Sequence, residues 1–180
     1  MKIVQTAIPD VLMIEPKAFV DERGFFFESF NQAAFELAVC KSVTFVQDNH
    51  SSSLKNVLRG LHYQIHQPQG KLLRVVQGEV FYVSIDIRKS SPTFGQWIGQ
   101  IIFADNKKQL WLPEVFAQGF VLSDSAEFLY KKTDYYLPEL ERSIAFNDST
   151  LAVKLPIEGV PTFSIKDQQA KLLASAECFA

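Results

Sequence analysis

The stretch NVLRGLHYQ (56–64) holds two residues able to do chemistry, Arg59 and His62, in an otherwise apolar run typical of a strand. Charged side chains are rarely fully buried without partners. The two residues are therefore either solvated at the surface or part of a polar pocket inside an apolar barrel. A lone strand histidine is commonly a hydrogen-bonded structural residue, but with a carboxylate to orient it, it also serves as a general base.

Four cations lie in apolar or glycine-containing surroundings and not in charge runs. They are Arg23 in DERGFFFES, Arg59 in VLRGLH, and Lys71 and Arg74 in PQGKLLRV. Each one alone is equally well explained as a solvated or ion-paired strand residue. Together they indicate an anion site of the phosphate type, because guanidinium forks match phosphate oxygens in pairs. The chain has no glycine-rich strand-to-helix loop, so a P-loop is not expected to hold those phosphates.

The three histidines, His50, His62 and His66, do not favour a metal site. On an extended strand His62 and His66 share one face but stand about 13 Å apart, too far to bind one ion. A jelly-roll metal site usually offers two or three histidines and a carboxylate, whereas HYQ supplies a single histidine. We therefore predict no metal in this protein.

Short extended runs dominate the chain and must position these residues. GEVFYVSIDIR (78–88) alternates between two faces, and KLLRVVQ (71–77) precedes it with a turn at Gly78, so the two runs are predicted to form a hairpin. Turn residues separate the other expected strands. These strands are WIGQIIFAD (97–105), QLWLP (109–113) and AEFLYKKTDYYL (126–137).

Helical patterns are few. NQAAFELAV (31–39) is predicted to be a helix with Asn31 as its N-cap, and SIKDQQAKLLASAECF (164–179) is expected to close the chain with another. Many short strands separated by turns predict an all-β sandwich or closed barrel and not a parallel α/β sheet.

The composition is that of an ordinary globular chain, with 47% hydrophobic residues and a net charge of −2 over 180 residues. That length suits a single domain (1–180), and the charge gives no field that favours nucleic acid or an anionic membrane. Only two cysteines are present, Cys40 and Cys178, which suits a reducing compartment. MKIVQTAIPD breaks at Pro9 and Asp10 before a signal-length apolar run, and no stretch is long enough to span a bilayer. We therefore expect a soluble cytoplasmic protein.

Eight fragments follow one another along the chain: DERGFFFESFN, FVQDNHSSS, NVLRGLHYQ, QGKLLRVVQGEV, SIDIRKSSPTFGQW, LWLP, FLYKKTDYY and FSIKD. Their order resembles the dTDP-4-dehydrorhamnose 3,5-epimerase family from about residue 6 to residue 167. The resemblance implies a jelly-roll (cupin-type) barrel with a few short helices, no metal or other cofactor, and a homodimer. It also implies epimerisation at C3 and C5 of a dTDP-4-keto-6-deoxy sugar, on the route to dTDP-L-rhamnose.

The resemblance also assigns roles to single residues. His62 matches the general base that removes a proton next to the C4 ketone, and Asp167 matches the carboxylate that orients it. Lys71 matches the cation beside the developing enolate oxygen, and Tyr130 matches the acid that returns a proton from the opposite face. The resemblance further implies that these residues contact the nucleotide, the diphosphate or the sugar: Arg23, Glu28, Gln47, Asn49, Arg59 and Glu141.

The chain departs from the family pattern in PEVFAQGF (113–120), where the family usually reads P-x-G-F-A-H-G-F. Gln118 replaces a histidine of the site, and an amide forms hydrogen bonds but carries neither a proton nor a charge at neutral pH. Val115 replaces a glycine, so the loop is expected to follow a different path. Tyr82 stands where an aspartate is common, and Leu155 where a tryptophan is common.

These departures leave several reactions open. With Gln118 keeping the hydrogen bond, the chain is a full 3,5-epimerase; otherwise it inverts one centre only, or it acts on a related nucleotide sugar. A ketoisomerase of the same barrel is less favoured, because relatives of that kind usually carry paired histidines in the pocket. A binding protein without catalysis is disfavoured as well, because His62, Asp167, Lys71 and Tyr130 are all present.

Overall fold

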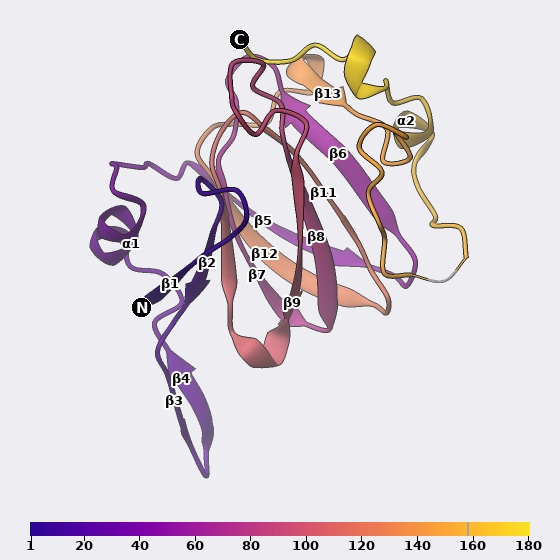
Figure 1. Ribbon diagram of the computed structural model, residues 1–180. Coiled ribbons are helices and arrows are strands. Elements are labelled where there is room, and N and C mark those ends of the chain that lie inside the picture. The colour runs from indigo at the N-terminus through magenta and orange to yellow at the C-terminus, as the bar shows by residue number, and fades with distance from the viewer. Residues whose placement is uncertain (158) are drawn as a thin grey trace.

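The computed structural model describes residues 1–157 and 159–180, and most of its ordered elements are strands of two facing sheets (Figure 1). The six-stranded sheet has the order β1 (Lys2–Gln5), β2 (Leu12–Glu15), β10 (Gln109–Leu112), β7 (Lys71–Gln77), β12 (Ala126–Lys132), β5 (Gln47–Ser53). The five-stranded sheet has the order β13 (Glu141–Ser143), β6 (Leu58–Gln64), β11 (Phe116–Val121), β8 (Glu79–Asp86), β9 (Trp97–Phe103). A separate hairpin consists of β3 (Ala18–Asp21) and β4 (Gly24–Phe27).

The main core lies between the two sheets. Strand β8 shows how the sequence builds it: Val80 and Tyr82 face the partner sheet, whereas Val83 and Ile85 pack in a second cluster on the outer face of the five-stranded sheet. Alternate side chains of a strand point to opposite faces, and both faces of β8 are covered. The all-β jelly-roll barrel is therefore confirmed, with apolar side chains on both sides of its central strands.

The predicted hairpin between residues 71–77 and 79–88 is wrong. Both strands exist, but β7 belongs to the six-stranded sheet and β8 to the five-stranded sheet, so they do not pair. At Gly78, with a φ of +73°, the chain crosses between the sheets. A Cβ there would lie 2.3 Å from the carbonyl oxygen of Ser125, so only glycine fits this crossing.

The helices are few and short. Besides α1 (Gln32–Val39), whose N-cap Asn31 accepts a hydrogen bond from the Ala34 amide at 3.0 Å as predicted, they are α2 (Ile165–Gln168), η1 (Ala104–Asn106), η2 (Pro138–Leu140) and η3 (Leu173–Ser175). The long C-terminal helix expected over 164–179 is wrong. The backbone at Lys171 is extended, and its carbonyl accepts a hydrogen bond from the Ala145 amide. Hydrogen bonds to a distant segment thus replace those of a helix. No helix in 1–157 or 159–180 is long and apolar enough to cross a membrane.

The run 126–137 is a strand only as far as Lys132. Beyond it the chain turns back over β5 and β6, where the Thr133 amide bonds to the Gly70 carbonyl and the Tyr136 amide bonds to the Gln47 side chain. The aromatic pattern of this segment therefore reflects residues packed at the barrel mouth and not a longer strand.

A β-bulge in β6 decides which of its side chains enter the barrel. His62 pairs with Gln118 of β11 and Arg59 pairs with Phe120, so two residues of β6 lie opposite the single residue Gly119. The extra residue lets side chains three positions apart share one face, which a regular strand does not allow. Arg59 and His62 consequently both line the same cavity.

Two glycines make this bulge possible. A Cβ on Gly60, whose φ is +136°, would lie 2.5 Å from the Gly119 Cα, and a Cβ on Gly119 would lie 2.8 Å from the Arg59 carbonyl oxygen. The two backbones approach more closely than any side chain permits. The glycine of LRGLH and the glycine of AQGF therefore serve one structural purpose together.

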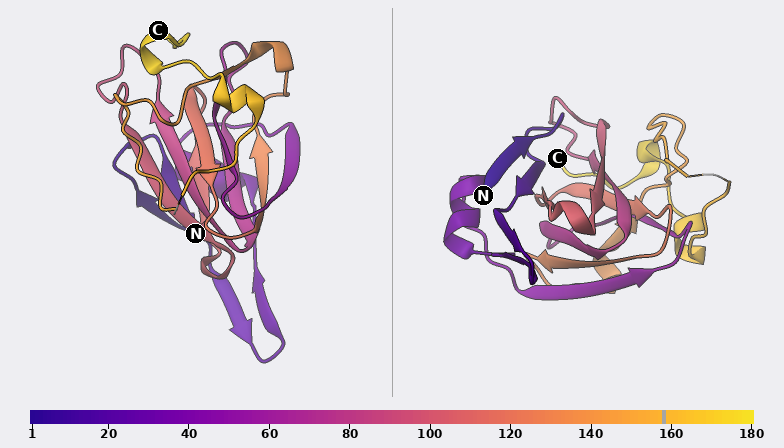
Figure 2. Two further views of the ribbon diagram at one scale, coloured as in Figure 1. Left: turned by 90° about the vertical axis from the view of Figure 1, so that its right-hand side faces the viewer. Right: turned by 90° about the horizontal axis from the view of Figure 1, so that it is seen from below.

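The β3–β4 hairpin projects from the body of the molecule (Figures 1 and 2). Its apolar side chains are exposed: Phe19 by 55%, Val20 by 78%, Phe25 by 58% and Phe26 by 71%. Contiguous apolar surface of this kind marks an interaction site in soluble proteins.

Alanine substitutions at two glycines test the bulge. Gly24, with a φ of +124°, has open space around its Cβ position, so Gly24→Ala reports the backbone strain alone, about 1–3 kcal/mol. Gly60→Ala adds the collision with Gly119, and we expect it to lower the free energy of unfolding in urea by about 1–3 kcal/mol more than Gly24→Ala does. Equal losses in the two variants would show that the close approach imposes no constraint.

Candidate active site

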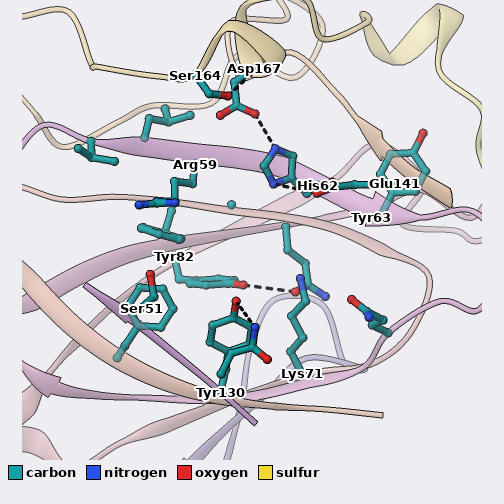
Figure 3. Close-up of a pocket in the computed structure, with 18 of the residues that line it drawn as sticks. Ser51, Arg59, His62, Tyr63, Lys71, Tyr82, Tyr130, Glu141, Ser164 and Asp167 are labelled. Carbon is teal, nitrogen blue, oxygen red and sulfur yellow. Dashed lines mark hydrogen bonds and ion pairs between the residues drawn. The ribbon is translucent and has the colours of Figure 1, made fainter. Parts of the chain in front are cut away.

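A cavity of about 640 Å³ opens between the two sheets, on the side where α2 lies near β6 (Figure 3). It gathers side chains from strands of both sheets and from the C-terminal segment. These residues that the sequence predicts for the site line it: Asn49, Arg59, His62, Lys71, Gln118, Tyr130, Glu141 and Asp167.

His62 is held by a carboxylate that lies 105 residues further along the chain. Its Nε2 is 2.5 Å from Oδ1 of Asp167, a buried residue in the first turn of α2. Ser164 caps that turn, because its hydroxyl oxygen accepts a hydrogen bond from the Asp167 amide. A carboxylate only accepts, so Nε2 carries the proton and Nδ1, on the cavity side of the ring, is left as the basic nitrogen (Figure 3).

The Asp167 carboxyl is ionised in this setting. Burial raises its pKa, but the hydrogen bond and charge of His62 and the contacts with Ser164 outweigh burial and bring the pKa below its ordinary value. The negative charge of Asp167 stabilises the imidazolium that forms when His62 takes up a proton.

Glu141 places a second carboxylate beside the same ring. Its Oε1 lies 3.6 Å from His62 Nδ1, while its Oε2 accepts hydrogen bonds from the Tyr136 hydroxyl at 2.6 Å and from the Lys166 ammonium. Burial raises the pKa of Glu141, but these two hydrogen bonds and the charge of the nearby His62 outweigh burial and bring the pKa below its ordinary value. His62 therefore lies between two anions, and both attract the positive charge of its protonated form.

Tyr130 faces His62 from the opposite wall of the cavity (Figure 3). It projects from β12, and its hydroxyl oxygen accepts a hydrogen bond from the Asn49 side chain at 3.2 Å. Burial raises its pKa, so the phenol keeps its proton at neutral pH. A proton donor and a proton acceptor thus stand on opposite sides of one cavity.

Lys71 of β7 reaches into the cavity beside these groups. Burial and the nearby charge of Lys132 together lower its pKa to about 7, against an opposing effect of Glu141. Nearby, Nε of Arg59 donates to the Ser53 hydroxyl at 3.2 Å, and the rest of its guanidinium lines the cavity. Two basic groups are therefore available to anionic parts of a ligand.

Gln118 lies beside His62 on the neighbouring strand, as its place in the register requires. The hydroxyl of Tyr82 donates to its Oε1 at 3.3 Å in a buried contact. Because the amide oxygen is occupied in this way, its NH2 group is the part left to face a ligand. Two of the four positions that depart from the family pattern, Tyr82 and Gln118, thus contact each other.

The expectation that Val115 sends its loop along a path different from the family's stays a prediction. Val115 adopts a φ of +71°, in the left-handed region that a glycine would occupy there, and its side chain packs against the main core. A β-branched residue in this region is strained by about 1–3 kcal/mol. Phe116, directly after Val115, is anchored in the core at 2% exposure and holds this end of the loop in place.

Three residues predicted for substrate binding lie outside the cavity of this chain. Arg23 lies at the turn of the β3–β4 hairpin, where it forms an ion pair with Asp21, and Glu28 follows the hairpin. Gln47 lies behind the cavity wall and donates to the Asn49 side chain at 2.7 Å.

Arg74 also faces away from this cavity. It lies three residues after Lys71 on a stretch of β7 without a bulge, so the two side chains point to opposite faces of the sheet. Arg74 lines a separate cavity of about 320 Å³, with its guanidinium 5.9 Å from the Phe27 ring centre. Of the other histidines, His50 is exposed beside Glu127 and His66 is exposed after β6.

Sequence reasoning missed Lys132, Gln64 and Gln69 among the lining residues. The signal for Lys132 is its spacing, because it follows Tyr130 by two positions on the same strand and must share its face. The side-chain amides of Gln64 and Gln69 donate hydrogen bonds to the backbone carbonyls of Tyr135 and Asp134 at the barrel mouth, and no local pattern indicates these contacts. In 1–157 and 159–180, no group of three or more His, Cys, Asp or Glu side chains is placed to hold a metal ion.

Comparison with known proteins agrees with this geometry. The family model described as dTDP-4-dehydrorhamnose 3,5-epimerase matches residues 5–175. The dTDP-4-dehydrorhamnose 3,5-epimerase of Salmonella typhimurium is 59% identical over 178 residues, covering 98% of this chain and 97% of its own. The corresponding enzyme of Pseudomonas aeruginosa is 57% identical over 180 residues and covers 99% of each chain.

A solved structure gives the same answer. The dTDP-6-deoxy-D-glucose-3,5-epimerase of Legionella pneumophila, crystallised in complex with dTDP-4-keto-L-rhamnose, superimposes with a TM-score of 0.94 at 52% identity. The alignment covers 98% of this chain and 94% of that one. With the matched sequence, the shared barrel and a histidine–carboxylate pair facing a tyrosine, the chain belongs to the dTDP-4-dehydrorhamnose 3,5-epimerase family.

Proposed function

We propose that this protein epimerises dTDP-4-keto-6-deoxy-D-glucose at C3 and C5 and so forms dTDP-4-dehydrorhamnose. The observation that carries the proposal is the placement of His62, oriented by Asp167, across the cavity from Tyr130. A base on one face of a sugar ring and an acid on the other turn proton removal and return into inversion of a carbon.

The first step is removal of a proton from a carbon next to the C4 ketone. His62 Nδ1 accepts this proton, and the carboxylates of Asp167 and Glu141 stabilise the imidazolium. Such a proton is too weakly acidic for an imidazole to remove unaided, so the enolate must be stabilised as it forms. The Lys71 side chain stands beside the C4 oxygen for this purpose, and one contact of that kind supplies about 3–4 kcal/mol.

The second step is proton return from the opposite face. The Tyr130 phenol gives its proton to the carbon that lost one, and the ketone re-forms at C4. C3 and C5 both flank the ketone, so the same groups serve both centres if the ring turns or shifts between the two events. The raised pKa of Tyr130 keeps the phenol protonated at the start of each cycle.

The nucleotide part of the substrate needs its own contacts. Arg59 is proposed to bind the diphosphate, because a guanidinium fork matches phosphate oxygens in pairs. Asn49, supported by Gln47 at 2.7 Å, and the free NH2 group of Gln118 are proposed as hydrogen-bond donors to the substrate. The two free cysteines suit the reducing cytoplasm, where we expect this enzyme to act.

Inversion of a single centre is the second candidate, and the Tyr82–Gln118 contact favours it. A neutral amide held by a phenol replaces the histidine and aspartate that are common in the family, so position 118 supplies no group that carries a proton. A ketoisomerase is less well supported, because His50 and His66 are exposed and give His62 no histidine partner in the cavity.

Deuterium incorporation from D2O, followed by proton NMR of dTDP-4-keto-6-deoxyglucose, tests the reaction. We expect deuterium at both C3 and C5, and Asp167→Asn to slow both exchanges by roughly 10³–10⁴-fold, because the imidazole loses its orienting carboxylate. Asp48→Asn, which removes an exposed carboxylate paired with Lys131, is the control and leaves the rates unchanged.

Exchange at C3 alone or at C5 alone would assign the single-centre reaction. A wild-type protein that catalyses no exchange at either carbon would contradict epimerisation of this sugar. An Asp167→Asn variant as fast as the wild type would remove the proposed base from the mechanism.

We further propose that the protein acts as a homodimer and that each hairpin serves the site of the partner. Phe19, Phe25 and Phe26 expose apolar surface on the β3–β4 arm. We propose that a second copy of the chain covers this surface in the homodimer. Arg23, at the tip of this arm, and Glu28, at its base, lie outside the cavity of their own chain. In a dimer the arm would carry both to the nucleotide bound by the other chain.

Mixing two inactive variants tests this arrangement. His62→Asn removes the base, and Arg23→Met removes the arm cation, so each homodimer is expected to be impaired. Random subunit exchange would create hybrid dimers with one intact site each, restoring about a quarter of the wild-type activity. If hybrids form, as seen with differently tagged chains, and activity stays absent, Arg23 does not serve the partner's site.

A further inference from the structure

Two lysines stand directly opposite each other in the β7–β12 strand pair. Lys132 is the register partner of Lys71, and both side chains line the cavity. Residues opposite each other in an antiparallel pair have Cβ atoms about 4.5–5.5 Å apart, and like charges in such positions repel. Lys132 is only 6% exposed, so water screens this repulsion weakly.

The neighbours of this pair supply little negative charge. The Lys132 ammonium lies over the rings of Tyr130 and Tyr136, 5.8 and 5.0 Å from their centres. The carboxylate of Glu141, on β13, is the group that attracts both lysines. It is already engaged by Tyr136 and by a lysine of α2.

In the part of the chain that the structure describes, the other elements around Lys71 add no compensating charge. Strand β6 contributes the basic groups His62 and Arg59, and the carboxylate of Asp167 is bound to that histidine. Strand β8 contributes the neutral phenol of Tyr82, and Glu114, after β10, forms an ion pair elsewhere, with a lysine near α1. Two ammonium groups therefore share one partly engaged carboxylate.

We propose that Lys132 is a positioning residue that makes Lys71 the proton donor to the C4 oxygen of the bound ketone. This inference rests on the proposed function and deepens it. Lys71 then does more than attract the enolate, because repulsion from its neighbour drives its proton toward the oxygen as negative charge develops there. The pKa of Lys71, brought to about 7 by burial and by Lys132, suits a group that gives and retakes a proton near neutral pH.

The proton balance closes over one inversion. His62 takes the proton from carbon, and Lys71 gives one of its ammonium protons to the C4 oxygen, which leaves a neutral enol and a neutral amine. Tyr130 then protonates the carbon while Lys71 recovers the proton from the enol oxygen, and the ketone returns. At the end His62 carries an extra proton and Tyr130 lacks one. Either the proton moves from His62 to Tyr130, or His62 releases a proton to solvent while Tyr130 takes one from solvent, and both routes restore the starting state.

The alternation of β12 offers a matched pair of variants. Lys131 and Lys132 are adjacent, but Lys131 faces outward and pairs with Asp48 at 3.0 Å. Lysine Cε shifts in ¹³C-lysine-labelled protein, with Lys71 assigned through Lys71→Arg, give its titration directly in the free enzyme. We expect Lys71 to titrate near pH 7 in the wild type and in Lys131→Met, and about one pH unit higher or more in Lys132→Met.

The pH profile of kcat/KM for deuterium incorporation tests whether Lys71 donates a proton during catalysis. A donor must be protonated, so activity is expected to fall above the titration point of Lys71. In Lys132→Met this loss of activity at high pH, the alkaline limb of the profile, should move to higher pH together with the NMR titration of Lys71. In Lys131→Met the alkaline limb should stay at the wild-type pH. Lys132→Arg keeps the charge and is expected to keep the wild-type limb.

The results of these experiments distinguish failure of the Lys132 inference from failure of the proposed epimerase function. If Lys132→Met leaves the Lys71 titration unmoved, or if Lys132→Arg shifts it as far as Lys132→Met does, charge repulsion is not the cause and the inference fails. If the titration moves and the alkaline limb does not, Lys71 is no proton donor. If the wild type exchanges no deuterium at all, the proposed function fails, and the NMR titration still reports on the lysine pair.

Discussion

The contact between Gly60 of β6 and Gly119 of β11 decides which side chains reach the cavity. Because two residues of β6 occupy the space of one, Arg59 and His62 turn to the same face, and His62 comes to lie beside Gln118. Without this bulge one of the two basic residues would point away from the substrate. A backbone irregularity, and not a side chain, is thus the first requirement of the site.

The two walls of the cavity carry groups of different charge. On one wall the His62 ring lies between the carboxylates of Asp167 and Glu141. On the other wall the half-buried Tyr130 phenol keeps its proton, and the paired side chains of Lys71 and Lys132 favour negative charge on an oxygen of the ligand. The proposed removal of a proton and the proposed stabilisation of the enolate therefore fall on opposite walls of the cavity, in keeping with the preorganisation that electrostatic catalysis requires.

Much of this arrangement was predictable from sequence, and the failures have physical causes. Alternation within 78–88 and the cap at Asn31 are local, so both predictions held. The crossing at Gly78 depends on a backbone 47 residues away, which no hairpin pattern reveals. Arg74 was grouped with the site by its neighbours, but spacing on a regular strand turns it outward. Lys132 went unnoticed because it reads as half of a solvated lysine pair, although the alternation buries it.

The central claim is that Asp167 fixes the tautomer of His62 and leaves Nδ1 free to accept a proton. Long-range ¹H–¹⁵N NMR measures this directly, and the sequence has only three histidines to assign. At a pH where His62 is neutral, we expect the proton on Nε2 and an unprotonated Nδ1. A proton on Nδ1 would contradict the account, because the nitrogen that faces the substrate would then have no lone pair to offer.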